Sequence, residues 1–263
     1  MAKSFIYPVA TATITDGTYG TTANGGTTYT FASGNTVANE HRISDDSIGS
    51  AVSSYGSSIN DTIQFDLGGS YACDVIAIYL SAASAANMEL YYSSSASNMG
   101  TDSSDPSVPL TTSPAMSTNH DAGWNIRTFT EITDRYWYVR ATGGDITPSE
   151  IIIGKKYDFD INFDLNNKIG EEFATDTIIS QGGNEYYTKR HAPKTTWDWK
   201  WSYLTSGQKT SLDGLNSSVQ DYKKFLYYDE TDYHYVRMTK PMNFTEVAVN
   251  TYSTAFSITE QLS

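Results

Sequence analysis

The sequence predicts a mainly β protein with one short helix, and composition, alternation of apolar residues and the frequency of turn residues all favour that class. Tyrosine occurs 20 times and only 18% of the 263 residues are charged, while Ser, Thr, Gly and Asn fill the intervals. Aromatic residues favour strands and small polar residues favour turns. Only residues 206–222 show apolar residues at three- and four-residue steps, with Ser206 as the expected N-cap. Gly214 favours an earlier helix end, near Asn216.

The most regular alternation lies at residues 195–204, which read T-T-W-D-W-K-W-S-Y-L. Side chains point to alternate faces along a strand, so this pattern gives one aromatic face and one polar face. The aromatic face comprises Trp197, Trp199, Trp201 and Tyr203. Two interpretations are open at this point: a core strand, or an exposed aromatic shelf for a sugar or a partner protein.

Charge and cysteine content exclude several classes. The net charge of −13 argues against a nucleic-acid-binding surface. Cys73 is the only cysteine, so the chain can form no internal disulfide and no thiolate metal cluster. The first residues lack the apolar core of a signal peptide, and the longest apolar run, residues 75–80, is too short to span a bilayer. We therefore expect a soluble protein synthesised in the cytoplasm.

Several strand patterns follow one another in the first half of the chain. They are I-Q-F-D-L-G at 63–68, V-I-A-I-Y-L at 75–80, L-Y-Y-S at 90–93, R-Y-W-Y-V-R at 135–140 and S-E-I-I-I-G at 149–154. Gly68-Gly69 is expected to break the first strand, and residues 93–121 form a long polar loop. The order and spacing of these five motifs resemble the discoidin-like, galactose-binding-like family. The resemblance implies an N-terminal jelly-roll β-sandwich over residues 1–154, with ligands bound by loops at one end.

A second domain is expected over residues 155–263. It opens with a strand at 157–165 in which apolar residues alternate with Asp158, Asp160 and Asp164. This acidic row is expected to face water or a basic partner. Further strands are expected at 185–190, 225–228, 234–238 and 252–260.

The second half resembles the C-terminal halves of bacteriophage minor tail and distal tail proteins. The resemblance rests on an aromatic strand, a helix with spaced leucines, then F-L-Y-Y-D, Y-H-Y-V-R and a last strand ending in glutamate. It places Arg237 and Glu260 at the family's arginine and terminal-glutamate positions. It also implies that Trp199, Trp201, Leu212 and Leu215 are core residues, with the two tryptophans packed against the two leucines. An N-terminal jelly roll departs from the family, where such a domain is often inserted or follows the ring-forming part.

Nothing in the sequence points to catalysis or to a cofactor. The four histidines have no metal-site spacing, and no nucleophile elbow or phosphate loop appears. Carboxylates two residues apart on one strand do not converge as a glycosidase pair does. Jelly rolls of this type often hold calcium, but Asp45, Asp46 and Glu150 lack the spacing of a calcium loop and are interpreted as ordinary loop acids.

We therefore predict a non-enzymatic structural component of a tailed-phage virion, at the distal tail, baseplate or tail tip. The resemblance implies a ring of copies, commonly a hexamer, joining the tail tube to tip or hub proteins. The acidic row would line the tail lumen, and the first domain would project outward as a host-surface or glycan-binding module. The alternative is a free lectin-like module. Its aromatic platforms for sugar would be Trp124 and Tyr55. A hydrolase of surface polysaccharide ranks third.

Overall fold

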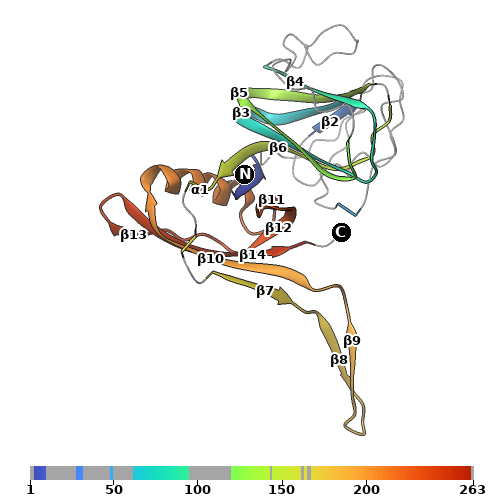
Figure 1. Ribbon diagram of the computed structural model, residues 1–263, viewed down its shortest axis with the longest axis vertical. Helices are drawn as coiled ribbons and strands as arrows, with labels where there is room; N and C mark the ends of the chain where they lie inside the picture. The colour runs from blue at the N-terminus through green and yellow to red at the C-terminus, as the bar shows by residue number, and fades with distance from the viewer. Residues whose placement is uncertain are drawn as a thin grey trace. The chain divides into compact units, whose positions relative to one another are not determined.

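The computed structural model describes residues 3–9, 28–31, 48–49, 62–94, 120–142, 144–160, 163–164 and 167–261 (Figure 1). Fourteen strands and one helix lie in these residues, so the mainly β class is confirmed. The chain divides into two compact units, one of Ile6–Lys156 with Ser263 and one of Met1–Phe5 with Tyr157–Leu262. They are called the first and the second unit below. The sequence placed the domain boundary after Gly154; the division falls after Lys156 and assigns the first five residues to the second unit.

The first unit is an antiparallel sandwich built on two long strands. It holds β2 (Thr28–Phe31), β3 (Thr62–Leu80), β4 (Asn87–Ser93) and β5 (Gly123–Thr142), together with β1 (Ser4–Pro8) from Ile6 onward and β6 (Pro148–Asp158) up to Lys156. The hydrogen-bonded order is β4-β5-β3-β6-β1, and β2 pairs with β3. Side chains from both halves of β3, such as Phe65 and Ile78, lie in one buried cluster with Trp137 of β5. The long β3–β5 pair therefore folds over and encloses a single core.

Gly68-Gly69 does not break the strand, contrary to the sequence prediction. β3 continues through this point as a bulge, because its register with β5 shifts between Asp66 and Tyr71. Gly68 has φ +76°, a backbone conformation that suits glycine, and its N–H donates to Asp66 Oδ1 over 2.8 Å. Arg135 of β5 donates to both oxygens of the same carboxylate, over 2.6 and 2.8 Å. The bulge bends the strand instead of ending it.

The second unit holds a sheet and a separate two-stranded ribbon. Its further strands are β7 (Lys168–Glu172), β8 (Thr175–Ile179), β9 (Glu185–Lys189), β10 (Lys194–Thr205), β11 (Lys224–Tyr228), β12 (Tyr233–Lys240), β13 (Thr245–Ala248) and β14 (Thr251–Glu260). The sheet has the order β1-β11-β12-β14-β10-β7, with β13 also paired to β14, while β8 and β9 pair only with each other. The sequence did not predict β7, β8 or β13 as strands.

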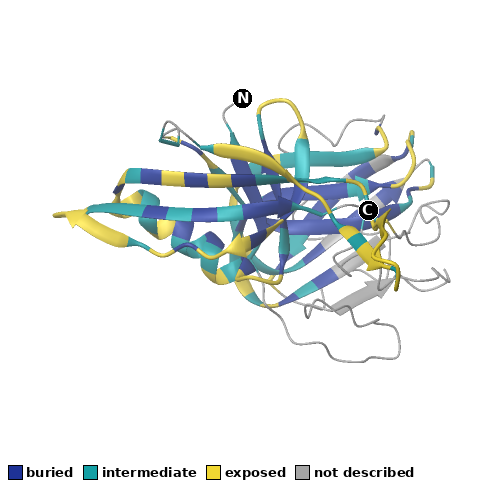
Figure 2. Ribbon diagram, turned by 90° about the horizontal axis from the view of Figure 1, so that it is seen from below, coloured by how far each residue is buried: buried dark blue, intermediate teal, exposed yellow. Residues whose placement is uncertain are grey.

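The tryptophans of β10 belong to the core of the second unit, not to an exposed shelf. Trp197, Trp199 and Trp201 are 4%, 3% and 2% exposed, and residues along the long strands alternate between buried and exposed (Figure 2). Tyr203, predicted on the same face, is 74% exposed. The register between β10 and β14 shifts between Trp201 and Leu204, so Leu204 takes the buried position instead.

Other aromatic rings surround the tryptophans. Trp199 stacks on Phe163 with a centroid distance of 4.6 Å and an interplanar angle of 5°, and Trp201 stacks on Phe256 at 5.4 Å. Phe5 of β1 lies 5.5 Å from the Trp199 ring. Aromatic pairs add roughly 0.5–1.5 kcal/mol each beyond the burial of their area. The core therefore depends mainly on aromatic contacts from strands far apart in the sequence.

The helix α1 (Ser206–Val219) is longer than predicted and has a different cap. Thr205, not Ser206, is the N-cap, and its hydroxyl accepts the Gln208 N–H while the Gln208 side chain accepts the Thr205 N–H. The helix continues through Gly214 because Leu212, Leu215 and Val219 are all fully buried. Burial of this apolar face outweighs the low helix propensity of glycine.

Gly154 of β6 is expected to tolerate no side chain. A Cβ there would lie 1.9 Å from the carbonyl oxygen of Tyr7. We predict that Gly154→Ala lowers the free energy of unfolding of the first unit by about 3 kcal/mol or more, because backbone must move. Gly69→Ala is the matched control, since its nearest atom is the edge of the Tyr71 ring at 3.3 Å. Urea denaturation measures both, and equal losses would contradict the prediction.

Candidate functional site

The β8–β9 ribbon, called the arm below, carries four of the ten large apolar side chains that are exposed among the described residues. β9 is exposed along its whole length, and β8 is exposed at every residue except Asp176. Figure 1 draws the arm as a hairpin apart from the sheet. Large side chains on it are 58–64% exposed, namely Ile178, Ile179, Tyr186 and Tyr187. An exposed apolar patch of this kind typically marks an interaction site.

Both faces of the arm carry large apolar side chains. Ile178 lies directly opposite Tyr186, and Thr177 lies opposite Tyr187. Because side chains alternate along a strand, Ile178 and Tyr186 share one face while Ile179 and Tyr187 lie on the other. A ribbon lying flat on one surface would bury only one such face. The arrangement therefore suits insertion between two surfaces or into a groove.

Local interactions fix the register of the arm. At the turn, Asn184 donates its backbone N–H to Ser180 Oγ over 3.0 Å, and Gly183 has φ +79°. At the other end Arg190 pairs with Asp176. An isolated two-stranded ribbon is marginally stable in water. Its preformed pairing thus presents the four large side chains in a defined order, without a covering layer of its own.

Exposed apolar residues continue from the arm onto the edge of the sheet. Ile169 of β7 is 72% exposed and Phe173, between β7 and β8, is 67% exposed. β7 pairs with β10 and is the last strand in the sheet order. An edge strand has unpaired backbone groups that can pair with another chain.

The predicted acidic row does not lie on one strand. β6 ends at Asp158, and the following residues up to Asn167 are not in a strand among those described. Asp160 is exposed and accepts only a 3.5 Å hydrogen bond from Gln208. Asp164 instead accepts from the backbone N–H of Ser202 over 3.2 Å and from its hydroxyl, so this carboxylate is bound to β10. A lumen-facing role for Asp158 and Asp160 stays a prediction.

The predicted ligand residues of the first unit are only partly described. Tyr55 and the calcium candidates Asp45 and Asp46 lie outside the described residues. Trp124 is half-buried and packs edge-to-face on Tyr79, its cross-strand partner, at 5.3 Å. Glu150 is 3% exposed. Within the described ranges, no group of three or more His, Cys, Asp or Glu side chains is arranged to hold a metal ion, and no helix is long and apolar enough to cross a membrane.

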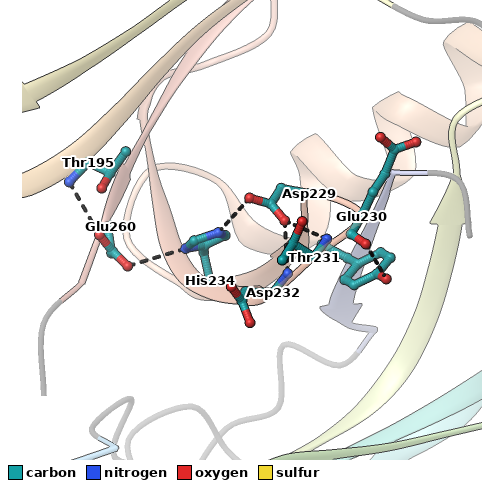
Figure 3. A network of polar contacts seen from close by, with 8 residues as sticks. Thr195, Asp229, Glu230, Thr231, Asp232, His234 and Glu260 are labelled. Atoms are coloured by element: carbon teal, nitrogen blue, oxygen red, sulfur yellow. Dashed lines mark hydrogen bonds and ion pairs between the residues drawn. The ribbon is translucent and has the colours of Figure 1, made fainter.

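A polar network in the second unit, which the sequence did not predict, centres on His234 of β12 (Figure 3). Its Nε2 lies 3.1 Å from Asp229 Oδ2, and its Nδ1 lies 3.3 Å from Glu260 Oε1. Glu260 Oε2 also accepts from the backbone N–H of Thr195. The tail-protein resemblance singled out Glu260 and Arg237, but Arg237 is exposed. The three members of the network, Asp229, His234 and Glu260, lie in the F-L-Y-Y-D motif, the Y-H-Y-V-R motif and the last strand, but nothing in their spacing predicts that they meet.

The turn that carries Asp229 is itself well ordered by hydrogen bonds. Asp229 Oδ1 accepts from the backbone N–H groups of Thr231 and Asp232 over 2.8 and 2.9 Å. Burial raises the pKa of Asp229, but these two N–H donors and the His234 ring outweigh burial and hold that pKa below its ordinary value. Asp229 is therefore an ionised acceptor at neutral pH.

No protein-family model matches the chain, and no curated protein does. Among solved structures, a module described as CpGH89CBM32-6 of Clostridium perfringens is 13% identical, and the alignment covers 51% of this chain and 94% of that one, with a TM-score of 0.36. CBM32-1 of a Clostridium perfringens family 31 glycoside hydrolase is 15% identical, with 49% and 94% coverage and a TM-score of 0.36. A chitosan-binding module of a Paenibacillus sp. IK-5 chitosanase/glucanase, solved with chitotriose, is 18% identical, with 48% and 95% coverage and the same TM-score. Likeness at this level carries no functional argument.

Asp164 is expected to have a structural role that Asp160 lacks. We predict that Asp164→Ala lowers the free energy of unfolding of the second unit by about 1–2 kcal/mol, because Ser202 loses a charged acceptor for two donors. Asp160→Ala should change it by less than about 0.5 kcal/mol. Guanidinium denaturation of both variants tests this, and equal stability of the two would refute the structural role.

Proposed function

We propose that this chain is a non-catalytic assembly protein whose second unit joins other protein subunits through the arm. The observation that carries the proposal is the exposure of Ile178, Ile179, Tyr186 and Tyr187 on both faces of a preformed ribbon. Exposed apolar side chains do not improve the solubility of a 29.0 kDa chain with net charge −13, so solubility does not explain why these residues are exposed. Burying them against protein removes apolar area from water and supplies the covering layer that the ribbon lacks.

The assembly that fits best is a tailed-phage virion, at the distal tail, baseplate or tail tip. Support for this finer proposal comes from the resemblance of the second half to tail proteins. The proposed partners are copies of the same chain in a ring, together with tail-tube and hub proteins. Closed rings also satisfy open sheet edges such as β7, since each edge meets the same surface of the next copy.

Arm variants test the proposal. We expect the wild-type chain to form oligomers well above 29.0 kDa, measured by light scattering after size exclusion. The double variant Ile178→Ser/Tyr186→Ser should lower the oligomer mass toward that of the single chain, because one apolar face of the arm is removed. Ile179→Ser/Tyr187→Ser should do the same for the other face.

The matched control is Tyr203→Ser, which removes a 74% exposed tyrosine that lies off the arm. It should leave the mass unchanged. Circular dichroism confirms that all variants fold. A wild-type chain that is monomeric both alone and with tail proteins of the same particle would refute the assembly function, as would full-size oligomers from both arm variants.

Carbohydrate binding by the first unit is the second candidate. The observation that favours it is the half-buried Trp124–Tyr79 pair at the start of β5. An aromatic ring with polar neighbours is the usual platform for a sugar. This activity would suit an outward, host-surface-binding role.

A glycan array separates the candidates. If the first unit binds sugar, Trp124→Ala should weaken retention about tenfold or more, because the platform is lost. Tyr136→Ala is the matched control, since Tyr136 is a half-buried aromatic that packs elsewhere, against Tyr91. The wild-type chain binding no glycan, or Trp124→Ala binding as well as wild type, would remove the carbohydrate function while leaving the assembly function untouched.

A further inference from the structure

We propose that His234, Asp229 and Glu260 form a proton-controlled latch that holds the root of the arm. The imidazole of His234 lies between the two carboxylates, 3.1 Å from one and 3.3 Å from the other. All three side chains are 20–32% exposed, so solvent reaches them only in part. The latch does not depend on the function proposed above. A role of the latch in assembly would rest on that function, because the arm is the proposed assembly surface.

Both ring nitrogens of His234 face a carboxylate oxygen. A neutral imidazole has one N–H donor and one acceptor nitrogen, whereas both of its neighbours here are acceptors. Only the imidazolium, with two N–H groups, can donate to Asp229 and Glu260 at once. A neutral ring would place an acceptor nitrogen against a carboxylate. One side of the network would therefore open when the proton leaves.

Two aromatic rings and further carboxylates lie around the His234 ring. Trp197 of β10 and Tyr227 of β11 pack on it with centroid distances of 5.0 and 6.1 Å, and aromatic faces attract cations. Glu230 and Asp232 lie in the turn beside Asp229 and add negative charge. Burial, and then the charges of Asp229 and Glu230, raise the pKa of Tyr227, so its hydroxyl stays neutral.

The network connects to the arm through Glu260. The second oxygen of this carboxylate accepts from Thr195 N–H over 3.3 Å, and Thr195 also pairs with Glu171 of β7. Thr195 is the second residue of β10, and only residues 190–193 separate β10 from β9 of the arm. Glu260 thus contacts the start of β10, which leads out of the arm, and β7, which leads into the arm, is joined to that point by its pairing with β10. Loss of the imidazolium frees Glu260 to turn toward solvent.

The direction of the pH dependence follows from which charge state of each group the folded protein stabilises. Interactions that favour a charged histidine stabilise the fold at low pH and are lost as pH rises through the titration range of histidine, about pH 6 to 8. The depressed pKa of Asp229 acts in the opposite sense, and its contribution is lost as pH falls below about 4. The two-carboxylate geometry therefore closes the latch when the ring carries both protons and loosens it when one proton leaves.

Hydrogen exchange with mass spectrometry on the full chain tests the latch. After correction for intrinsic exchange, amides of residues 195–197 and 230–234 should lose roughly tenfold or more of their protection between about pH 5.5 and pH 8. His234→Gln should show the low protection at both pH values, because glutamine carries no charge. His191→Gln is the matched control, since His191 lies between the arm and β10 and its Nδ1 contacts only the carbonyl of Ala192.

Two outcomes would overturn the latch. One is pH-independent protection of these amides in the wild type; the other is an equal loss of protection in His191→Gln. If His234→Gln does not fold, side-chain ¹⁵N NMR of the wild type decides, because a ring that is neutral at about pH 5.5 refutes the proposal. Oligomer mass is not read in this experiment, so failure of the latch and failure of the assembly function remain distinguishable.

Discussion

The second unit depends on the aromatic cluster around Phe5 and Trp199. The Phe5 ring lies 5.4 Å from Phe225, 5.5 Å from Trp199 and 5.9 Å from Phe256, so a single side chain near the N-terminus meets β10, β11 and β14. Bulky rings at these positions can be buried only if each strand keeps one face inward. That constraint fixes the register of the sheet, and a shift by one residue would move every ring to the opposite face. The opposite face of each of these strands then carries the polar side chains that form hydrogen bonds.

The same constraint explains why β10 is both a core strand and a support for function. Its middle is fixed by Trp197 to Trp201, while its first residues extend beyond the rings and are held by polar contacts to Glu260 and by pairing with β7. The arm begins just before this polar section. Strong apolar packing at the middle of the strand thus allows a weaker, titratable attachment at its start, because the sheet stays intact when the attachment opens.

Much of the fold could be predicted from the sequence, and the failures have local physical causes. Strict alternation identified β10 because burial on one face imposes a period of two. The same rule predicts a buried Tyr203, because no sequence pattern marks the register shift that buries Leu204 instead. The sequence predicts a strand end at Gly68, because glycine occurs at strand breaks and at bulges alike. The arm was missed in part because Thr175–Ile179 has no covering layer, and therefore no polar–apolar alternation. Its two-sided apolar character appears only once β8 is paired with β9.

The contacts of the acidic residues likewise could not be predicted from the sequence, and several of these contacts hold the fold together. The sequence contains 30 Asp and Glu residues, and nothing in it distinguishes a carboxylate that faces water from one that is hydrogen-bonded within the fold. Asp66 accepts the Arg135 fork, Asp164 accepts from Ser202, and Glu260 joins Thr195 to His234. Each of these connects segments far apart in the chain, so excess negative charge here is partly structural. Carboxylates that accept only backbone or hydroxyl donors hold their strands at any pH above their own titration. Glu260 differs because one of its donors is a histidine, and this makes the strength of one contact depend on pH in the neutral range.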